Sequence, residues 1–172
     1  MRSQNKNVVF KGKLLTLSTK TVLLPNGFRA HLEVIEHPGA VLIVPFLSKD
    51  KVILLRQFRP VLNTYLYELP AGTLKNKEAL LACAKRELIE ETGYAAKSFK
   101  KLGAIYPVPG YSTEKITIYA AEVVKAKYRR VEEDEVIQSC FVTKAKIKRL
   151  LRKGKIVDAK TICALGLCGW LP

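Results

Sequence analysis

Residues 68–94 have the sequence ELPAGTLKNKEALLACAKRELIEETGY, in which a short polar loop leads into a glutamate-rich stretch with helical spacing. On the predicted helix, Glu87, Glu90 and Glu91 share one face, because spacings of three and four residues bring side chains together. Three like charges this close repel one another unless a cation lies among them. The pattern therefore indicates a site for a divalent cation.

Capping residues and apolar spacing set the expected limits of this helix. Asn76 is a suitable N-cap, so the helix is expected at 77–91. Gly93 is expected to end it, because glycine readily adopts the left-handed conformation found after many helices. We expect the core face to consist of the apolar residues at helical intervals, which are Leu80, Leu81, Ala84 and Leu88.

The rest of the chain alternates between short strands and helices. Continuous apolar runs at 41–46 and 51–57 are typical of strands buried on both faces. Strands on both sides of helices predict an α/β (α+β) sandwich, with a mixed β-sheet between helices and an N-terminal antiparallel β segment. We expect strands at residues 8–17, 20–24, 28–37, 41–46, 51–57, 65–69, 101–106, 116–124 and 136–142, and further helices at 144–153 and 159–171.

Composition narrows the class of protein. The 172 residues are 48% hydrophobic and 26% charged, which is ordinary for a globular chain and excludes disorder. The polar N-terminus does not resemble a signal peptide, no apolar run is long enough to span a bilayer, and the four cysteines lack metal-ligand spacing. We therefore expect reduced cysteines, a cytoplasmic location and no membrane partner. The net charge of +15 favours anionic partners without specifying one.

The full spacing of glycine, glutamate and arginine across residues 72–93 matches the signature of the Nudix hydrolases without a departure. This resemblance implies hydrolysis of a nucleoside diphosphate linked to another group. It also implies Mg²⁺, or Mn²⁺, as cofactor, since both ions prefer oxygen ligands. The ligands implied are Glu87 and Glu91, Glu90 as an additional one, and the backbone carbonyl of Ala71.

Segments outside the signature resemble the ADP-ribose pyrophosphatase branch of the family. The resemblance runs from about residue 27 to the last helix, so it covers most of the chain. It implies that the substrate is ADP-ribose or another nucleoside diphosphate sugar, with AMP and ribose 5-phosphate as the products from ADP-ribose. The matching segments are residues 56–59, 68–72, 107–114, 134–137 and 158–161.

The same resemblance implies substrate-binding residues. Arg59 is expected to bind a phosphate through its charge and its two-pronged guanidinium, and Arg56, three residues earlier, is a further substrate-binding candidate. Glu114 follows a loop rich in proline and glycine, and loops of this kind often present site residues, so we expect it to contact the substrate or a metal-bound water.

Residues of the N-terminal segment are expected near the nucleoside. Glu33 matches an acidic position that lies near it in the branch. An aromatic residue often stacks on the adenine near position 32, but Leu32 is not aromatic, so Phe28 or Phe10 would have to serve. The preferred base is therefore open between ADP-, GDP- and UDP-linked sugars.

The general base in this branch comes from an acidic loop before a late strand, which corresponds here to residues 132–135. We predict Glu135 as the first candidate and Glu133 as the second. Glu90, from the signature itself, is the third candidate.

The resemblance also implies a homodimer built through the N-terminal strands. We expect residues 1–38 to form this β segment and residues 39–172 to form the Nudix hydrolase domain. One alternative is a Nudix hydrolase for capped RNA 5′ ends or dinucleoside polyphosphates, whose long anionic chain would suit the charge of +15. Another is a non-catalytic, basic nucleic-acid-binding module. Three clustered carboxylates disfavour nucleic acid as a partner, because such a module has no need of them.

Overall fold

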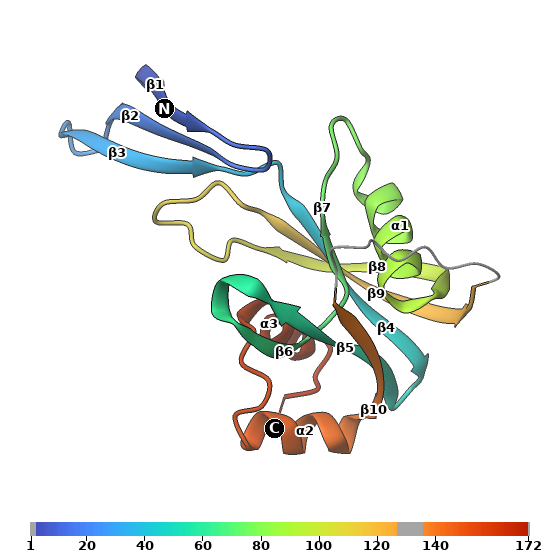
Figure 1. Cartoon of the computed structure of the whole chain (residues 1–172). Coiled ribbons are helices and arrows are strands. Elements are labelled where there is room, and N and C mark those ends of the chain that lie inside the picture. The colour runs from blue at the N-terminus through green and yellow to red at the C-terminus, as the bar shows by residue number, and fades with distance from the viewer. Residues whose placement is uncertain (1–2, 127–135, 172) are drawn as a thin grey trace. The chain divides into compact units, whose positions relative to one another are not determined.

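The computed structural model describes residues 3–126 and 136–171. The chain forms two compact units (Figure 1). The first, called the N-terminal unit here, comprises Met1–Gly39 with Tyr106–Lys115, and the second, called the catalytic unit, comprises Ala40–Ile105 with Ile116–Pro172. Among the described residues, no helix is both long and apolar enough to cross a membrane.

The N-terminal unit contains a three-stranded antiparallel sheet in the order β1-β2-β3. The single strand expected at 8–17 is wrong, because the chain reverses between Gly12, whose N–H donates to Leu15, and the start of the next strand. A turn precedes Phe28, in which the N–H of Gly27 donates to the carbonyl of Leu24 and Gly27 has a φ of 83°. The strands are β1 (Ser3–Lys11), β2 (Thr16–Leu23) and β3 (Arg29–Glu36).

Glu36, at the end of β3, joins all three strands of this sheet. Its carboxylate pairs with Lys6 on β1 at 2.6 Å and with Lys20 on β2 at 2.7 Å. Hydrogen bonds from Lys20 and then Lys6 lower the pKa of Glu36 from 4.5 to about 2. The ionised carboxylate therefore stabilises the folded unit above pH 4.5, and this contribution is lost as the pH falls from 4.5 toward 2.

Glu36→Gln is expected to lower the melting temperature at pH 7 by about 2 °C, because a partly exposed ion pair is worth about 1 kcal/mol or less. The difference from the unsubstituted protein should narrow as the pH falls from 4.5 toward 2, where Glu36 becomes protonated in both states. Thermal unfolding followed by circular dichroism across this range measures it. A difference that stays constant with pH would contradict the assignment.

The catalytic unit is built on a seven-stranded mixed sheet. Its main path runs β10-β5-β4-β9-β8, with β6 paired to β5 and β7 to β4, and only the β4–β9 pairing is parallel among the described strands. The elements are β4 (Ala40–Ser48), β5 (Lys51–Arg59), β6 (Thr64–Glu68), β7 (Ala71–Thr73), α1 (Leu80–Thr92), β8 (Tyr94–Ile105), β9 (Ile116–Lys125), β10 (Ile137–Thr143), α2 (Lys144–Arg152) and α3 (Ala159–Leu167).

Helices cover both faces of this sheet, so the expected sandwich is confirmed. Strand β4 shows why its sequence is apolar throughout. Leu42 and Val44 pack in the cluster that contains residues of α2 and α3, whereas Val41 and Ile43 pack in the cluster that contains residues of α1. Successive side chains of a strand point to opposite faces, so both sets are buried.

The start of α1 differs from the expectation. Asn76 is not its N-cap, because the helix begins at Leu80 with Ala79 as an N-cap that makes no side-chain bond. Lys77 has a left-handed φ of 59°, which a residue of a right-handed helix does not adopt. The helix therefore starts after Lys77. The expected end at Gly93 is confirmed, with a φ of 75°.

The core face of α1 is also rotated slightly from the predicted one. Ala84 and Leu88 are fully buried as expected, but Leu81 is 46% exposed and Cys83 takes its place in the core. Two other element boundaries differ from the expected ones. Strand β8 begins at Tyr94, before the expected residue 101, and the last helix ends at Leu167, not at residue 171.

Candidate active site

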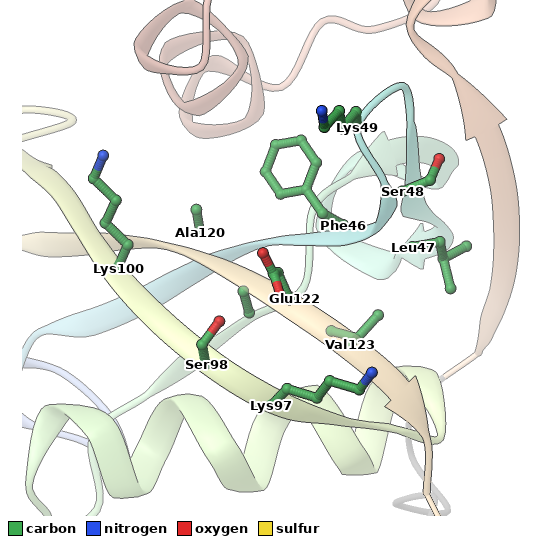
Figure 2. Close-up of a pocket in the computed structure, with 11 residues that line it drawn as sticks. Phe46, Leu47, Ser48, Lys49, Lys97, Ser98, Lys100, Ala120, Glu122 and Val123 are labelled. Carbon is green, nitrogen blue, oxygen red and sulfur yellow. The ribbon is translucent and has the colours of Figure 1, made fainter.

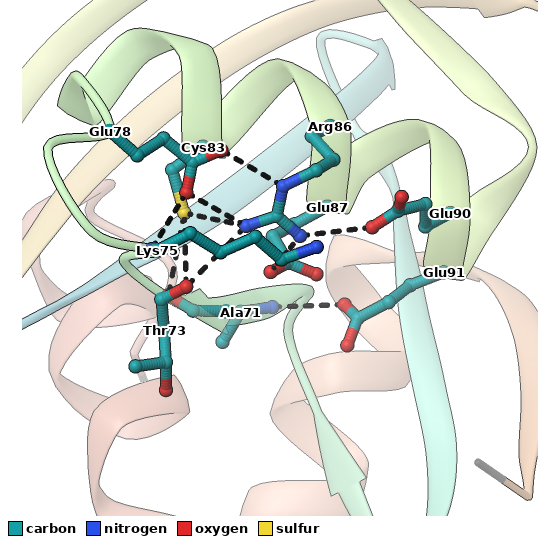
Figure 3. A network of polar contacts seen from close by, with 10 residues as sticks. Ala71, Thr73, Lys75, Glu78, Cys83, Arg86, Glu87, Glu90 and Glu91 are labelled. Atoms are coloured by element: carbon teal, nitrogen blue, oxygen red, sulfur yellow. Dashed lines mark hydrogen bonds and ion pairs between the residues drawn. The ribbon is translucent and has the colours of Figure 1, made fainter. Parts of the chain in front are cut away.

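Arg86 lies at the centre of the glutamates of α1 (Figure 3). Its guanidinium bonds Glu78 at 2.9 Å, Glu87 at 2.6 Å and Glu90 at 3.0 Å. The bond to Glu78 is the largest cause that raises the pKa of Arg86, and the same bond lowers the pKa of Glu78 to about 2. Arg86 therefore joins the loop residue Glu78 to Glu87 and Glu90 of the helix.

Strand β7 lies directly against these carboxylates. A Cβ on Gly72 would stand 1.9 Å from the carboxyl carbon of Glu87, so any larger residue at this position would displace that carboxylate. One residue earlier, the N–H of Ala71 donates to the carboxylate of Glu91 at 3.0 Å (Figure 3). Glu91 is only 3% exposed, so this backbone contact holds a buried carboxylate in place. The contacts thus link Ala71 to Glu91, Gly72 to Glu87, and Glu87 to Glu90 through Arg86.

This arrangement fits a divalent cation. The available donors are oxygens only, as Mg²⁺ and Mn²⁺ prefer, and the missing side chain of Gly72 lets the β7 backbone approach them. Within residues 3–126 and 136–171, no three His, Cys, Asp or Glu side chains converge closely enough to hold an ion in this structure. The carboxylates of Glu87 and Glu90 contact Arg86 instead.

A second charged cluster forms around Glu68, at the end of β6. Arg59 donates Nε and Nη2 to the two oxygens of Glu68, at 2.7 and 2.6 Å. Lys160, from the first turn of α3, also donates to Glu68, and to Asp158 at 2.8 Å. Burial by itself would raise the pKa of Glu68, but the bonds from Arg59 and the charge of Lys160 outweigh it and lower that pKa.

The sequence predicts Arg59 as a phosphate-binding residue but indicates no role for Glu68 or Lys160. Glu68 is 1% exposed, and a buried carboxylate always needs a partner. Its position in the β-rich run that precedes Leu69 and Pro70 was the available signal, because strand neighbours of that kind are buried. Its second partner is 92 residues away in the sequence, which no local pattern indicates.

The other predicted residues lie apart from these clusters or in the N-terminal unit. Arg56 is exposed, with its guanidinium 4.0 Å from the centre of the Tyr65 ring. In the N-terminal unit, Glu33 is exposed on β3, Phe28 is 64% exposed, and Glu114 lies 3.8 Å from Nε2 of His37. Glu133 and Glu135, the first candidates for the general base, lie outside the described residues.

A pocket of about 540 Å³ opens elsewhere in the catalytic unit (Figure 2). Its lining comes from the ends of β4 and β9, the turn after β4, and the first half of β8. Lys49, Lys97 and Lys100 give it positive charge, but none of the predicted site residues lines it. We therefore place the candidate active site at α1 and β7, where the carboxylates are.

Three comparisons bear on this arrangement. The ADP-ribose pyrophosphatase of Bacillus subtilis is 36% identical over 162 residues, covering 93% of this chain and 88% of that protein. The GDP-mannose pyrophosphatase of Citrobacter koseri is 33% identical, covering 74% of this chain and 71% of that protein. A solved structure described as an ADP compounds hydrolase aligns with a TM-score of 0.81 at 26% identity, covering 96% of this chain and 90% of the other.

The NUDIX domain model matches residues 36–165, which is most of the chain and includes all of α1 and β7. Proteins of this family generally depend on a divalent metal, which agrees with the oxygen donors gathered on α1. The resemblance in sequence and the fold expected from it are both confirmed. The chain belongs to the Nudix family.

Proposed function

We propose that this protein hydrolyses the diphosphate linkage of ADP-ribose or a related nucleoside diphosphate sugar, giving a nucleoside monophosphate and a sugar phosphate. The observation that carries this proposal is the glutamate cluster of α1. Arg86 forms ion pairs with Glu87 and Glu90, and the backbone at Ala71 and Gly72 lies against Glu91 and Glu87. The pyrophosphatase names of the relatives support it for sugar nucleotides.

The glutamates of α1 and the Ala71 carbonyl are the proposed metal ligands, and Arg86 supports two of them. Glu87 and Glu91, with Glu90 and the carbonyl of Ala71, would hold Mg²⁺, for which Mn²⁺ can substitute. When bound, the metal supplies charge neutralisation at the diphosphate and a more acidic water. Arg86 keeps Glu87 and Glu90 from repelling each other, because its guanidinium bonds both.

Substrate contacts and the general base are part of the same proposal. Arg59, exposed enough to reach a ligand, would bind a phosphate, and Arg56 would extend the positive surface. Glu114, Glu33 and Phe28 would contact the remainder of the substrate. Glu135 is proposed as the base that accepts the water proton, with Glu133 and then Glu90 as alternatives.

We further propose that the protein is a homodimer formed through residues 1–38. The N-terminal unit exposes several large apolar side chains, and exposed patches of this kind commonly mark interfaces. Sedimentation equilibrium would give twice the monomer mass for the full chain and the monomer mass for a variant with charged residues at these positions. The exposed residues are Val8, Val9, Phe10, Leu14, Leu23 and Phe28.

Removal of metal is expected to abolish hydrolysis of ADP-ribose, and added Mg²⁺ should restore it. The reason is that the diphosphate and the clustered carboxylates are both anionic and repel each other without a cation. The measurement is product formation in EDTA and after Mg²⁺ addition, with AMP and ribose 5-phosphate identified by mass. Faster turnover of capped RNA 5′ ends or dinucleoside polyphosphates than of any sugar nucleotide would overturn the substrate assignment.

A further inference from the structure

Among the described residues of the catalytic unit, Glu68 is the most buried charged side chain that the proposed reaction leaves without a role. Its side chain is 1% exposed, yet it holds two cations, Arg59 from β5 and Lys160 from α3. Asp158 bonds Lys160 in turn and caps α3, so the cluster contains two cations and two anions. A buried charge is tolerated only with such partners, which means the cluster forms as a unit.

The geometry of Arg59 shows what Glu68 does to it. Glu68 takes the edge of the guanidinium formed by Nε and Nη2, in a two-pronged contact. Within the described residues Nη1 makes no hydrogen bond, and the Arg59 side chain is 39% exposed. The charge of Glu91, on α1, adds to the effects that raise the pKa of Arg59, so the guanidinium lies within electrostatic reach of the metal-binding helix.

The segment that carries Glu68 also touches the metal-binding residues. Three residues later, the Ala71 N–H binds Glu91. Between them, the N–H of Leu69 donates to Thr161 on α3 at 2.9 Å in a fully buried contact. One short piece of chain therefore positions Arg59 through a side chain and Glu91 through its backbone.

We propose that Glu68 is the positioning residue of the diphosphate site: it fixes the guanidinium of Arg59 so that Nη1 faces the substrate diphosphate. The proposal rests on the function proposed above. A free arginine loses rotamer entropy when it is immobilised by a ligand. Glu68 removes that cost before the substrate arrives, with Lys160 keeping the carboxylate ionised and in place.

Glu68→Gln keeps the size of the side chain but loses the charge and the two-pronged contact. We expect KM for ADP-ribose to rise about tenfold while kcat changes less than threefold, since the metal-binding glutamates are untouched. The dissociation constant for ADP-ribose in EDTA, measured by calorimetry, should rise by a similar factor. In an Arg59→Met background, Glu68→Gln should add less than a further twofold, because both changes act through one guanidinium.

The chain offers a matched control. Glu36 is also a carboxylate bound by two cations, Lys6 and Lys20, but it lies in the N-terminal unit. Glu36→Gln should leave KM for ADP-ribose within twofold of the unsubstituted protein. If Glu68→Gln does not fold, Lys160→Met serves as the second variant, since it removes one of the two cations that bind Glu68. It should raise KM about threefold, and this effect should vanish in the Arg59→Met background.

The outcomes are separable. A lower melting temperature for Glu68→Gln with KM and binding unchanged would make Glu68 a stabilising residue only and would overturn the proposal. The proposal would also be overturned if the increases in KM caused by Glu68→Gln and by Arg59→Met multiply in the double variant. If the unsubstituted protein binds ADP-ribose in EDTA but turns over no sugar nucleotide, the proposed function fails instead, and unchanged binding by Glu68→Gln would then overturn the role of Glu68 as well.

Discussion

Glu91→Gln is expected to lower kcat for ADP-ribose about a thousandfold at saturating Mg²⁺. The loss of one anionic ligand weakens the charge stabilisation that a metal supplies, which is worth several kcal/mol, and about 4 kcal/mol corresponds to this factor. The amide oxygen of glutamine can still accept the N–H of Ala71, so the fold should persist. Steady-state kinetics and Mn²⁺ binding by calorimetry measure the effect.

The control is Glu122→Gln, which removes an exposed carboxylate of β9 in the same unit. It should leave kcat and Mn²⁺ binding unchanged. A Glu91→Gln protein that keeps a third or more of the kcat, with normal Mn²⁺ binding, would show that Glu91 is held by Ala71 for structure alone.

Gly72→Ala is expected to reduce kcat about a hundredfold with a small loss of stability. The added Cβ would stand 1.9 Å from both the carboxyl carbon and an oxygen of Glu87, so the carboxylate must move. Displacing a catalytic group by about 1 Å can cost about a hundredfold in rate. The displaced atoms end a flexible side chain, so the melting temperature should fall by only about 4 °C. Kinetics and thermal unfolding of one preparation give both values.

Gly103→Ala is the matched control, because its Cβ would meet only Leu167 at an ordinary 3.5 Å. It should change kcat less than twofold. If folded Gly72→Ala keeps its kcat within threefold of the unsubstituted protein, then the close approach of Gly72 to Glu87 has no catalytic importance.

Elements with a strong local pattern could be predicted from the sequence, and those shaped by distant partners could not. Strand β4 has a continuous apolar run, and its burial on both faces followed directly. The first half of β8 was missed because its lysines and small residues do not form a strand pattern, and its pairing with β9 makes it a strand. The start of α1 was missed because Glu78 remains in the loop, where it reaches Arg86.

The candidate site divides in the same way. The contact of Arg86 with Glu90 spans one helical turn, a spacing that is visible in the sequence. The pairing of Glu68 with Lys160 spans 92 residues and needs α3 to pack beside β6, so it escaped sequence reasoning. The roles of Glu114, Glu33, Phe28 and the acidic residues 132–135 remain predictions.

The sequence by itself determined the family and the acidic face of α1, because helical geometry alone brings Glu87, Glu90 and Glu91 to one face. Only the tertiary structure decided what surrounds that face. It placed Gly72 against Glu87, the Ala71 N–H on Glu91, and Arg59 with Lys160 on the buried Glu68. These contacts join separate strands and helices, and they form only when the sheet and its two helical layers bury their apolar faces together.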